Sequence, residues 1–465
     1  MIGRFGRWLR TPDARWLIAV TLLAFVVRLA VIGYVHPNPR DGRFDDSVWY
    51  DGSARHLAAG DGYVFDPAIF RAPDGSPVYP DDTRLTPTAL WPPGYPATLA
   101  VVYKLTGNSL AAGRLLNVLL GSATVALVFH IARRLFGRTE AVFAGLALAV
   151  LPSHALFTAV LLSETEFGFL LALVLAICVY FVFDRERRPR LPLLVGLGAL
   201  AAFTGYVRGE FLLFGGVIAL LLLIRLRRQA LQPLAALALG AALVITPWVV
   251  RNQLQLGSPV VGTTGSGRVA YQGHNPDSDG GPSLEATFKL EGKFQGLDRK
   301  QIELKSNREG SKLAREWAWD HPLEELKLVP QRMFFLFRSD ESGVTWIQSN
   351  HAWFGSQGAD RLIRISSVSF FGLIAVALAG APLWWDGRDL RRMAVFAVAP
   401  FTMLIFGVLF IGDPRYHYAL YVPLAVLAAP GLATLWRMTA EQFREVSRGR
   451  SLGQVLRTYG TPPSR

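Results

Sequence analysis

The chain has 465 residues, a net charge of +13 and a mean hydropathy of +0.30, and 51% of its residues are hydrophobic. This is too apolar for an ordinary soluble protein, and the apolar residues lie in runs of about 20, which is the length that crosses a membrane as a helix. The charge does not indicate a nucleic-acid-binding protein, because the basic residues cluster at the ends of the apolar runs. Cys178 is the single cysteine, so a disulfide within the chain and a thiolate zinc site are excluded.

Hydropathy predicts an all-α polytopic membrane protein with ten spans. The first apolar run follows a basic N-terminus and has no small-residue cleavage site, so it predicts an uncleaved span and not a signal peptide. The predicted spans cover residues 16–35, 110–135, 139–157, 163–183, 191–207, 210–224, 231–250, 361–385, 393–411 and 418–437.

The distribution of basic residues predicts the orientation. With the N-terminus in the cytoplasm, the basic segments after every second span fall on the cytoplasmic side, as the positive-inside rule requires. This predicts a multi-pass protein of the cell membrane, plasma or inner, with both termini cytoplasmic and two long polar segments extracytoplasmic. The predicted divisions are an N-terminal membrane module at 1–250 with the first polar segment at 36–108, a second polar segment at 251–360, C-terminal spans at 361–437 and a basic tail at 438–465.

Both polar segments contain predicted helices. "DGSARHLAAG" (51–60) predicts a short amphipathic helix, and residues 87–107 predict a helix along the membrane interface, with Trp91, Tyr95 and Tyr103 at the headgroups. A helical stretch is expected over 297–337, after a glycine-rich stretch. Gly265 and Gly267 resemble a phosphate loop only loosely, because no strand–loop–helix unit surrounds them.

Two adjacent carboxylates, Asp45 and Asp46, follow the first span. Tyr50 and Ala54 come after Asp46 at four-residue spacing, which places the three on one helical face and would hold a general base at Asp46 on a rigid element. The alternatives are a solvated acidic loop, or a divalent metal ion bound by the oxygens of both aspartates.

Further charged residues lie at the same predicted ends of the spans. Glu164 and Glu166 begin the fourth span, where acids are favoured by the helix dipole or face a functional cavity. Arg208 and Glu210, between the fifth and sixth spans, either pair with each other or join that cavity. The remaining candidates for donor binding or cavity lining are Arg251, Asn252, Asn275, Arg415, Tyr416 and His417.

Acids and arginines together at a membrane boundary suit a substrate with a hydroxyl to deprotonate and a phosphate to hold. The arginine guanidinium offers a bidentate fork to phosphate oxygens. His417 is a lone histidine, and such a residue is more often a polar interface residue than a metal ligand.

An ordered set of motifs resembles a known family. After the acid–Tyr–Ala spacing come "GDGY", "WPPGYP", "GRLLNVLLG", "RRLFG", "LLSETEF", "PWVVRN", "GHNPDSDG" and "RYHYALYVPL". The chain resembles the polytopic GT-C glycosyltransferases that use polyprenyl-phosphate sugars. More narrowly, it resembles the protein O-mannosyltransferases and lipid A aminoarabinose transferases, which are glycosyltransferase family 39 and its bacterial relatives.

The resemblance implies roles for matched residues. It implies that Asp46 is the catalytic base and that Glu164 lines the cavity. It also implies that Arg251 and Arg415 bind the lipid phosphate. The second acid of the family's pair falls on Ser47, so Asp45 is the candidate substitute.

The implied activity is an inverting transfer of a hexose or pentose from a polyprenyl-phosphate donor to a hydroxyl on a glycan, glycolipid or protein, on the extracytoplasmic face. No metal cofactor is implied, because the close relatives work without one. A lipid or sugar transporter is the alternative, but it predicts internal repeats, and none is seen. A non-catalytic scaffold would leave the clustered acids and arginines without a role.

Overall fold

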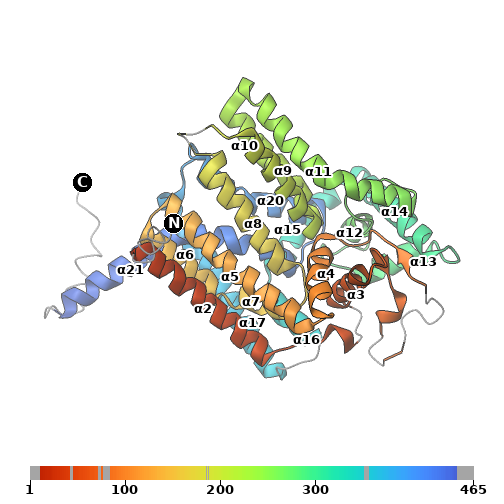
Figure 1. Ribbon diagram of the computed structural model, residues 1–465, viewed down its shortest axis with the longest axis horizontal. Coiled ribbons are helices and arrows are strands. Elements are labelled where there is room, and N and C mark those ends of the chain that lie inside the picture. The colour runs from red at the N-terminus through yellow and green to blue at the C-terminus, as the bar shows by residue number, and fades with distance from the viewer. Residues whose placement is uncertain are drawn as a thin grey trace.

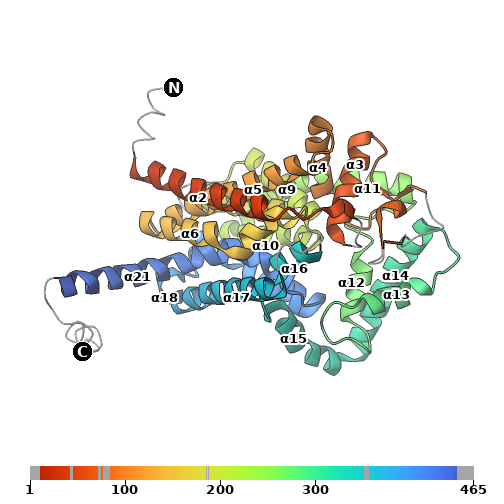
Figure 2. The ribbon, with the colours of Figure 1, turned by 90° about the horizontal axis from the view of Figure 1, so that it is seen from below.

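The structure is a computed structural model that describes residues 11–41, 45–71, 75–76, 84–184, 186, 188–349 and 355–447. Within these residues the chain is helical, apart from one antiparallel pair of short strands, β1 (Val64–Phe65) and β2 (Thr86–Pro87). Long helices form a bundle, and shorter ones gather at one end of it, called here the α3 end (Figure 1). Helix α2 begins, and helix α21 ends, at the opposite end of the bundle (Figure 2).

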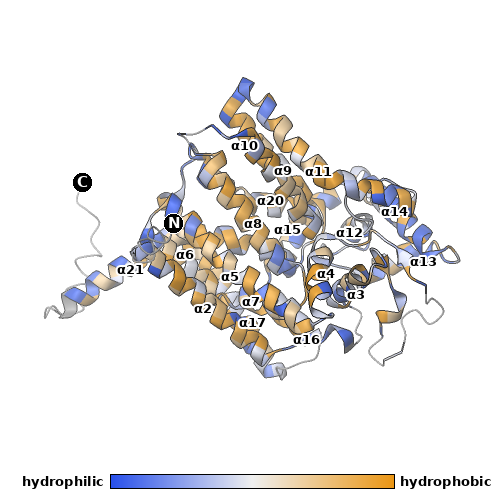
Figure 3. Cartoon of the chain, in the orientation of Figure 1, coloured by the Kyte–Doolittle hydropathy of each residue, from blue (hydrophilic) through white to orange (hydrophobic). Residues whose placement is uncertain are grey.

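Eight helical segments of the described chain are long and apolar enough to cross a membrane. They are α2 (Pro12–Tyr34), α5 (Leu110–Leu135), α8 with the π-helical turn after it (Glu164–Val182), α10 with its flanking turns (Gly209–Gln229), α11 (Leu231–Leu256), α17 (Ser356–Ala379), α19 and α20 with the turn that follows (Leu390–Leu409), and α21 with the turn before it (Pro414–Arg444). Figure 3 shows these helices as predominantly hydrophobic.

Two further elements complete the predicted set. Helix α6 (Arg138–Val150) and the segment Pro152–Ala159, which begins with α7 (Pro152–Leu156), are together long and apolar enough for a span, and they are bent by 61° at the break between them. Helix α9 (Leu191–Val207) is apolar but shorter. These elements correspond in order to the ten predicted spans, so the predicted all-α polytopic fold is confirmed.

The bend between α6 and α7 is stabilised by an arginine buried in the bundle. The last carbonyls of α6 have no partner within that helix. The Arg28 side chain, from α2, is fully buried and donates hydrogen bonds to the carbonyls of Ala149 (3.3 Å) and Leu148 (3.5 Å). It also contacts His154 Nδ1 at 2.5 Å, so one cation joins α2 to both halves of the bent span.

We expect Arg28→Met to destabilise the protein, because two buried carbonyls lose their donor. The expected loss is about 2 kcal/mol or more in the free energy of unfolding. Thermal unfolding in detergent, followed by size-exclusion chromatography, measures it. Arg15→Met on the same helix is the control, because Arg15 is exposed. Equal melting temperatures for the two variants would contradict this role.

The helices outside the spans gather at the α3 end, beside the bundle (Figure 2). The predicted helical stretch 297–337 is present as two helices, α14 and α15, separated at His321. The bounds are α3 (Asp46–Ala59), α4 (Gly94–Thr106), α12 (Ser266–Gly273), α13 (Leu284–Gly292), α14 (Arg299–Asp320), α15 (Pro322–Phe337) and α16 (Ser342–Ser349).

The short helix predicted at 51–60 forms the second part of α3, which begins at Asp46. Residues 47–54 are buried, 55–58 are half-buried and Ala59 is exposed. Asp51 is buried because Arg40, Arg55 and Tyr103 all donate to its carboxylate, at 2.6–3.0 Å. The buried carboxylate of Asp51 is thus satisfied inside the protein.

Two of the three aromatic rings predicted to lie at the headgroups are inside the protein. Helix α4 packs on α3, and its Tyr95 and Tyr103 are 0% and 1% exposed, so these rings do not face headgroups. Trp91 is half-buried and stacks on Trp49, with ring centroids 4.8 Å apart.

The two glycines that resemble a phosphate loop have a packing role. A Cβ on Gly267 would lie 2.0 Å from the carbonyl oxygen of Asn307, and one on Gly310 would lie 2.4 Å from the carbonyl oxygen of Gly267. Glycine at positions 267 and 310 therefore lets α12 and α14 approach closely. Gly265 is the N-cap of α12 and lies against the backbone of Leu90.

Candidate functional site

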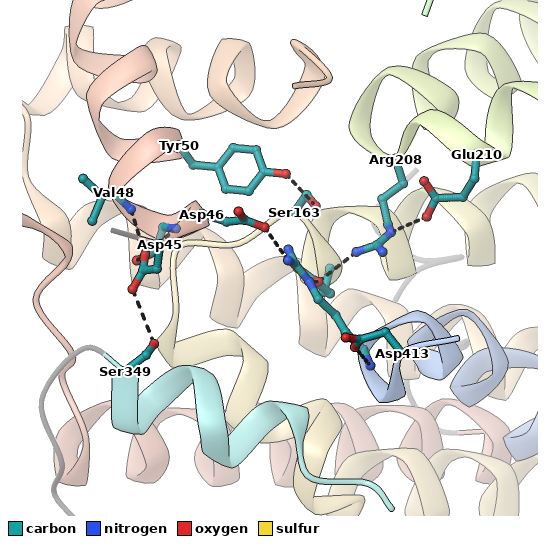
Figure 4. Close-up of polar contacts among 12 residues, drawn as sticks. Asp45, Asp46, Val48, Tyr50, Ser163, Arg208, Glu210, Ser349 and Asp413 are labelled. Atoms are coloured by element: carbon teal, nitrogen blue, oxygen red, sulfur yellow. Dashed lines mark hydrogen bonds and ion pairs between the residues drawn. The ribbon is translucent and has the colours of Figure 1, made fainter. Parts of the chain in front are cut away.

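The two aspartates of the first polar segment point in different directions. Asp45 is the N-cap of α3, and its Oδ1 accepts from the backbone N–H groups of Ser47 (2.8 Å) and Val48 (3.1 Å). Its Oδ2 accepts from the Ser349 hydroxyl of α16 at 3.4 Å. Asp46 is the first residue of α3, and its carboxylate is directed away from that of Asp45 (Figure 4). Asp45 therefore fixes the helix, whereas Asp46 is directed into the site.

Asp46 begins a continuous series of ionic contacts, called here the acid–arginine chain. Its Oδ2 contacts Arg415, which also contacts Glu164 Oε1 through Nε. Arg208 donates to the same Glu164 oxygen at 2.8 Å and to Glu210 Oε1 at 2.9 Å. The acid–arginine chain thus holds three carboxylates and two guanidinium groups.

Exposure differs sharply along the acid–arginine chain. The Glu164 side chain is fully buried, those of Arg208 and Arg415 are 8% and 13% exposed, and that of Asp46 is 24% exposed. Glu164 is thus a buried anion that holds two cations side by side, and Asp46 is more open to a substrate than any of these three.

The elements that carry these residues end or begin at the α3 end of the bundle. Asp46 and Glu164 start α3 and α8, and Arg208 is the C-cap of α9. Arg415 lies in the 3-10 turn η8 (Pro414–Leu420), whose N-cap Asp413 accepts from the Arg415 backbone N–H at 2.8 Å. Helix ends from four distant parts of the sequence thus converge on one place.

Aromatic rings border the guanidinium groups. The Arg415 guanidinium lies 4.6 Å from the ring centre of Trp346, and that of Arg208 lies 5.6 Å from the ring of Tyr416. The Tyr416 ring in turn stacks on Phe406 at 4.0 Å. Trp346 and Ser349 were not predicted as site residues. Their helix, α16, has no motif that indicates proximity to Asp46.

Burial and neighbouring charge shift several pKa values at the site. Burial raises the pKa of the Asp45 carboxyl, and likewise that of Asp413. Burial, followed by the charge of Asp46, raises the pKa of the Tyr50 phenol, which therefore stays neutral and donates to Ser163 Oγ at 3.4 Å. Burial alone would lower the pKa of the Arg208 guanidinium, but Glu210 and Glu164 more than offset this and raise it.

Glu166 has a different partner from Glu164, although both lie in the first turn of α8. Glu166 Oε1 accepts from the Thr98 hydroxyl of α4 at 2.7 Å, and its Oε2 accepts no hydrogen bond from the residues that the structure describes.

Arg251 and Asn252 make their contacts away from the acid–arginine chain. Arg251 Nη1 donates to the Thr88 carbonyl at 2.6 Å and to Asn252 Oδ1 at 2.9 Å, and Nη2 donates to the Tyr63 carbonyl. Asn252 Nδ2 donates to the Val260 carbonyl at 2.9 Å. Arg251 holds the first polar segment against the end of α11, and Asn252 holds the start of the second polar segment there.

The last two predicted site residues have local partners. Asn275 closes the turn after α12, with Nδ2 donating to the Tyr271 carbonyl at 2.7 Å. His417 is fully buried, with Nδ1 2.8 Å from the Leu336 carbonyl and Nε2 3.0 Å from Asp340 Oδ1. His417 therefore anchors the turn that carries Arg415.

The described residues contain no group of three or more His, Cys, Asp or Glu side chains placed to hold a metal ion. Asp45 and Asp46 direct their carboxylates apart, to Ser349 and Arg415 respectively.

Comparisons with known proteins bear on this arrangement. Residues 91–250 match the family model described as dolichyl-phosphate-mannose-protein mannosyltransferase. The chain is similar to the oligosaccharyltransferase AglB from Archaeoglobus fulgidus in complex with an inhibitory peptide and a dolichol-phosphate, with 14% identity and a TM-score of 0.51 over 96% of this chain and 52% of that one. The chain has the GT-C glycosyltransferase fold. The resemblance inferred from the motifs is thereby confirmed at the level of the fold.

Two other solved structures extend the comparison. The Archaeoglobus fulgidus oligosaccharyltransferase tethered with an acceptor peptide has 14% identity and a TM-score of 0.53, over 97% of this chain and 54% of that one. ArnT from Cupriavidus metallidurans bound to undecaprenyl phosphate has 16% identity and a TM-score of 0.42, over 92% of this chain and 79% of that one. No curated protein matches the chain. The chain spans about half the length of the two oligosaccharyltransferase structures.

Proposed function

We propose that this membrane protein transfers a hexose or pentose from a polyprenyl-phosphate donor to an acceptor hydroxyl, on the extracytoplasmic side. The observation that carries the proposal is the acid–arginine chain at one end of a GT-C bundle, in which the partly exposed carboxylate of Asp46 contacts Arg415, and Arg415 shares the buried Glu164 with Arg208. The dolichol-phosphate named for the AglB complex supports a lipid-linked phosphate as the donor class.

In the proposed reaction Asp46 is the general base. It removes the proton from the acceptor hydroxyl as that oxygen forms a bond to the anomeric carbon. The bond from the anomeric carbon to the phosphate oxygen breaks, and polyprenyl phosphate leaves with the electron pair. Attack opposite the leaving group inverts the configuration. Phosphate is a good leaving group, so a second carboxylate acting as an acid is not required.

The arginines have two tasks in this scheme. Arg415 and Arg208 stabilise the negative charge that develops on the leaving phosphate. Arg415 pairs with Asp46 in the structure. A donor phosphate that binds Arg415 would replace this partner and leave the Asp46 carboxylate available to the acceptor. Glu164, which contacts both arginines, keeps them in place.

A donor panel tests the proposed function. Membranes containing the protein are offered labelled polyprenyl-phosphate mannose, glucose, galactose and arabinose, with and without a chelator. We expect turnover of at least one donor, inverted anomeric configuration in the product by NMR, and no loss of rate with chelator. Retained configuration would contradict direct attack assisted by Asp46. A rate abolished by chelator and restored by a divalent ion would contradict the metal-free scheme.

A further inference from the structure

Helix α15 turns charged residues towards the protein and apolar residues outward. One series of residues at helical spacing faces the rest of the protein, namely Glu325, Leu328, Arg332 and Leu336. A second series with the same spacing begins two residues earlier and faces outward, namely Leu323, Leu326, Pro330 and Phe334, called here the outer stripe. An offset of two residues turns about 200° around a helix, so the two series lie on opposite sides of α15.

Ionic contacts hold the inner side of α15. The Arg332 side chain is fully buried, and its Nη2 donates to Glu325 Oε2 at 2.9 Å. The same oxygen lies 2.9 Å from His274 Nδ1, and Arg332 Nη1 donates to the carbonyl of Val408 at 3.0 Å. A helix at the surface of a soluble protein packs its apolar side inward and turns its charges to water. Helix α15 has the reverse arrangement.

The outer stripe is a continuous apolar surface. Its three large side chains, Leu323, Leu326 and Phe334, are between 64% and 68% exposed. Single exposed apolar side chains are common, whereas a contiguous apolar patch marks a surface that meets something apolar. Helix α15 has 16 residues and carries Glu324 and Lys327, so it is too short and too charged to cross a membrane. A helix of this kind suits the plane of a membrane surface, with its apolar side among the lipids.

The position of α15 brings the outer stripe to the lipid-facing surface of a span. Helix α15 packs on η7 (Ile405–Leu409), the π-helical turn that ends the span of α19 and α20. Met333 Cε occupies the space that a Cβ on Gly407 would need. Val408 and Leu409 of the same turn are exposed, and on a membrane span such side chains face lipid. In Figure 2, α15 leads from the α3 end back to the bundle. The outer stripe thus continues a lipid-facing surface at the point where the span ends.

We propose that α15 lies in the membrane surface at the α3 end, with Leu323, Leu326 and Phe334 in contact with lipid acyl chains. Lys327 is exposed beside the outer stripe, and its long side chain reaches the phosphates of the lipid headgroups. The bilayer is the occupant that accounts for both sides of the helix, because an apolar surrounding favours apolar residues outside and paired charges inside.

The inner side of α15 contacts the turn that carries Arg415. The carbonyl of Leu336 lies 2.8 Å from His417 Nδ1, and the carbonyl oxygen of Arg332 occupies the space that a Cβ on Gly412 would need. Residues 412 and 417 flank Arg415 on either side. Helix α15 therefore joins the membrane surface to the turn that places Arg415 in the acid–arginine chain.

Fluorophores on introduced cysteines test the proposal. Cys178 is buried, so a thiol-reactive fluorophore attaches to a cysteine introduced at the surface. Leu326→Cys and Phe334→Cys label the outer stripe, Leu243→Cys labels the middle of span α11 as the lipid control, and Lys305→Cys labels α14 as the water control. All four side chains are exposed, so the variants are expected to fold. Each labelled full-length protein is placed in lipid nanodiscs, and quenching is measured with lipids brominated on the acyl chain and with aqueous iodide.

The two quenchers distinguish lipid from water and from protein. We expect brominated lipid to quench both outer-stripe labels about half as strongly as the Leu243 label or more, and iodide to quench them about threefold less than the Lys305 label. Iodide quenching equal to that of the Lys305 label would overturn the proposal, because the outer stripe would then face water. Protection from both quenchers would also overturn it, because another protein surface, such as a second copy of the chain, would then cover the stripe. Quenching needs no turnover, so the result is independent of the proposed transfer reaction.

Discussion

Replacing Asp46 by asparagine is expected to lower the rate of sugar transfer by about 10²–10⁴-fold, which is the usual contribution of a positioned general base. Asparagine has nearly the same shape as aspartate and can still accept from Arg415, but it cannot take the acceptor proton. The loss should therefore appear in kcat, while the KM for the donor changes little. Initial rates in membranes, at several concentrations of the donor that wild type uses, measure both.

Asp45→Asn is the matched control, because the substitution is the same and lies one residue away. Asparagine caps helices about as well as aspartate, so the hydrogen bonds to the backbone of Ser47 and Val48 can persist. We expect this variant to keep a rate close to that of wild type. Full activity of Asp46→Asn together with a large loss in Asp45→Asn would assign the base to Asp45 and contradict the mechanism.

The sequence predicted the spans and the end of the bundle at which charges gather. Each span is a run of apolar residues long enough to be recognised alone. Once the spans are placed, the acids and arginines at their ends are placed as well. The structure brings five of the predicted residues into one set of contacts, namely Asp46, Glu164, Arg208, Glu210 and Arg415.

The side-chain directions could not be predicted in the same way. Arg251 also lies near the end of a span, but the polar segment around Thr88 packs against it, and the Thr88 carbonyl accepts a hydrogen bond from its guanidinium. The burial of Asp51 could not be predicted, because donors that satisfy it, such as Tyr103, come from a distant part of the chain. Trp346 borders Arg415 only because α16 folds back onto the bundle. These outcomes depend on tertiary contacts that periodicity does not encode.

Replacing Arg415 by glutamine is expected to reduce kcat/KM for the donor by about 10²–10³-fold, the usual cost of removing one group that stabilises developing negative charge. Glu164 keeps Arg208 as a partner at 2.8 Å, so the buried acid is not left unpaired. Arg338→Gln is the control, because Arg338 is 40% exposed and pairs with Glu341. Its rate should stay within about twofold of wild type, since exposed ion pairs contribute little.

The lysine variant separates charge from geometry. An ammonium keeps the positive charge but lacks the planar fork with which Arg415 contacts Asp46 and Glu164 together. We therefore expect Arg415→Lys to recover part of the activity that Arg415→Gln loses. Activity of Arg415→Lys no higher than that of Arg415→Gln would show that the fork, and not the charge alone, is required.

A double variant decides whether Arg415 acts on the donor or only on Asp46. If Arg415 only orients the base, adding Arg415→Gln to Asp46→Asn should cost no further activity, because there is no base left to orient. If Arg415 binds the donor phosphate, the second substitution should lower the residual rate again and raise the donor KM. The proposed mechanism requires the second result, because the arginine meets the leaving phosphate whether or not the acceptor is deprotonated.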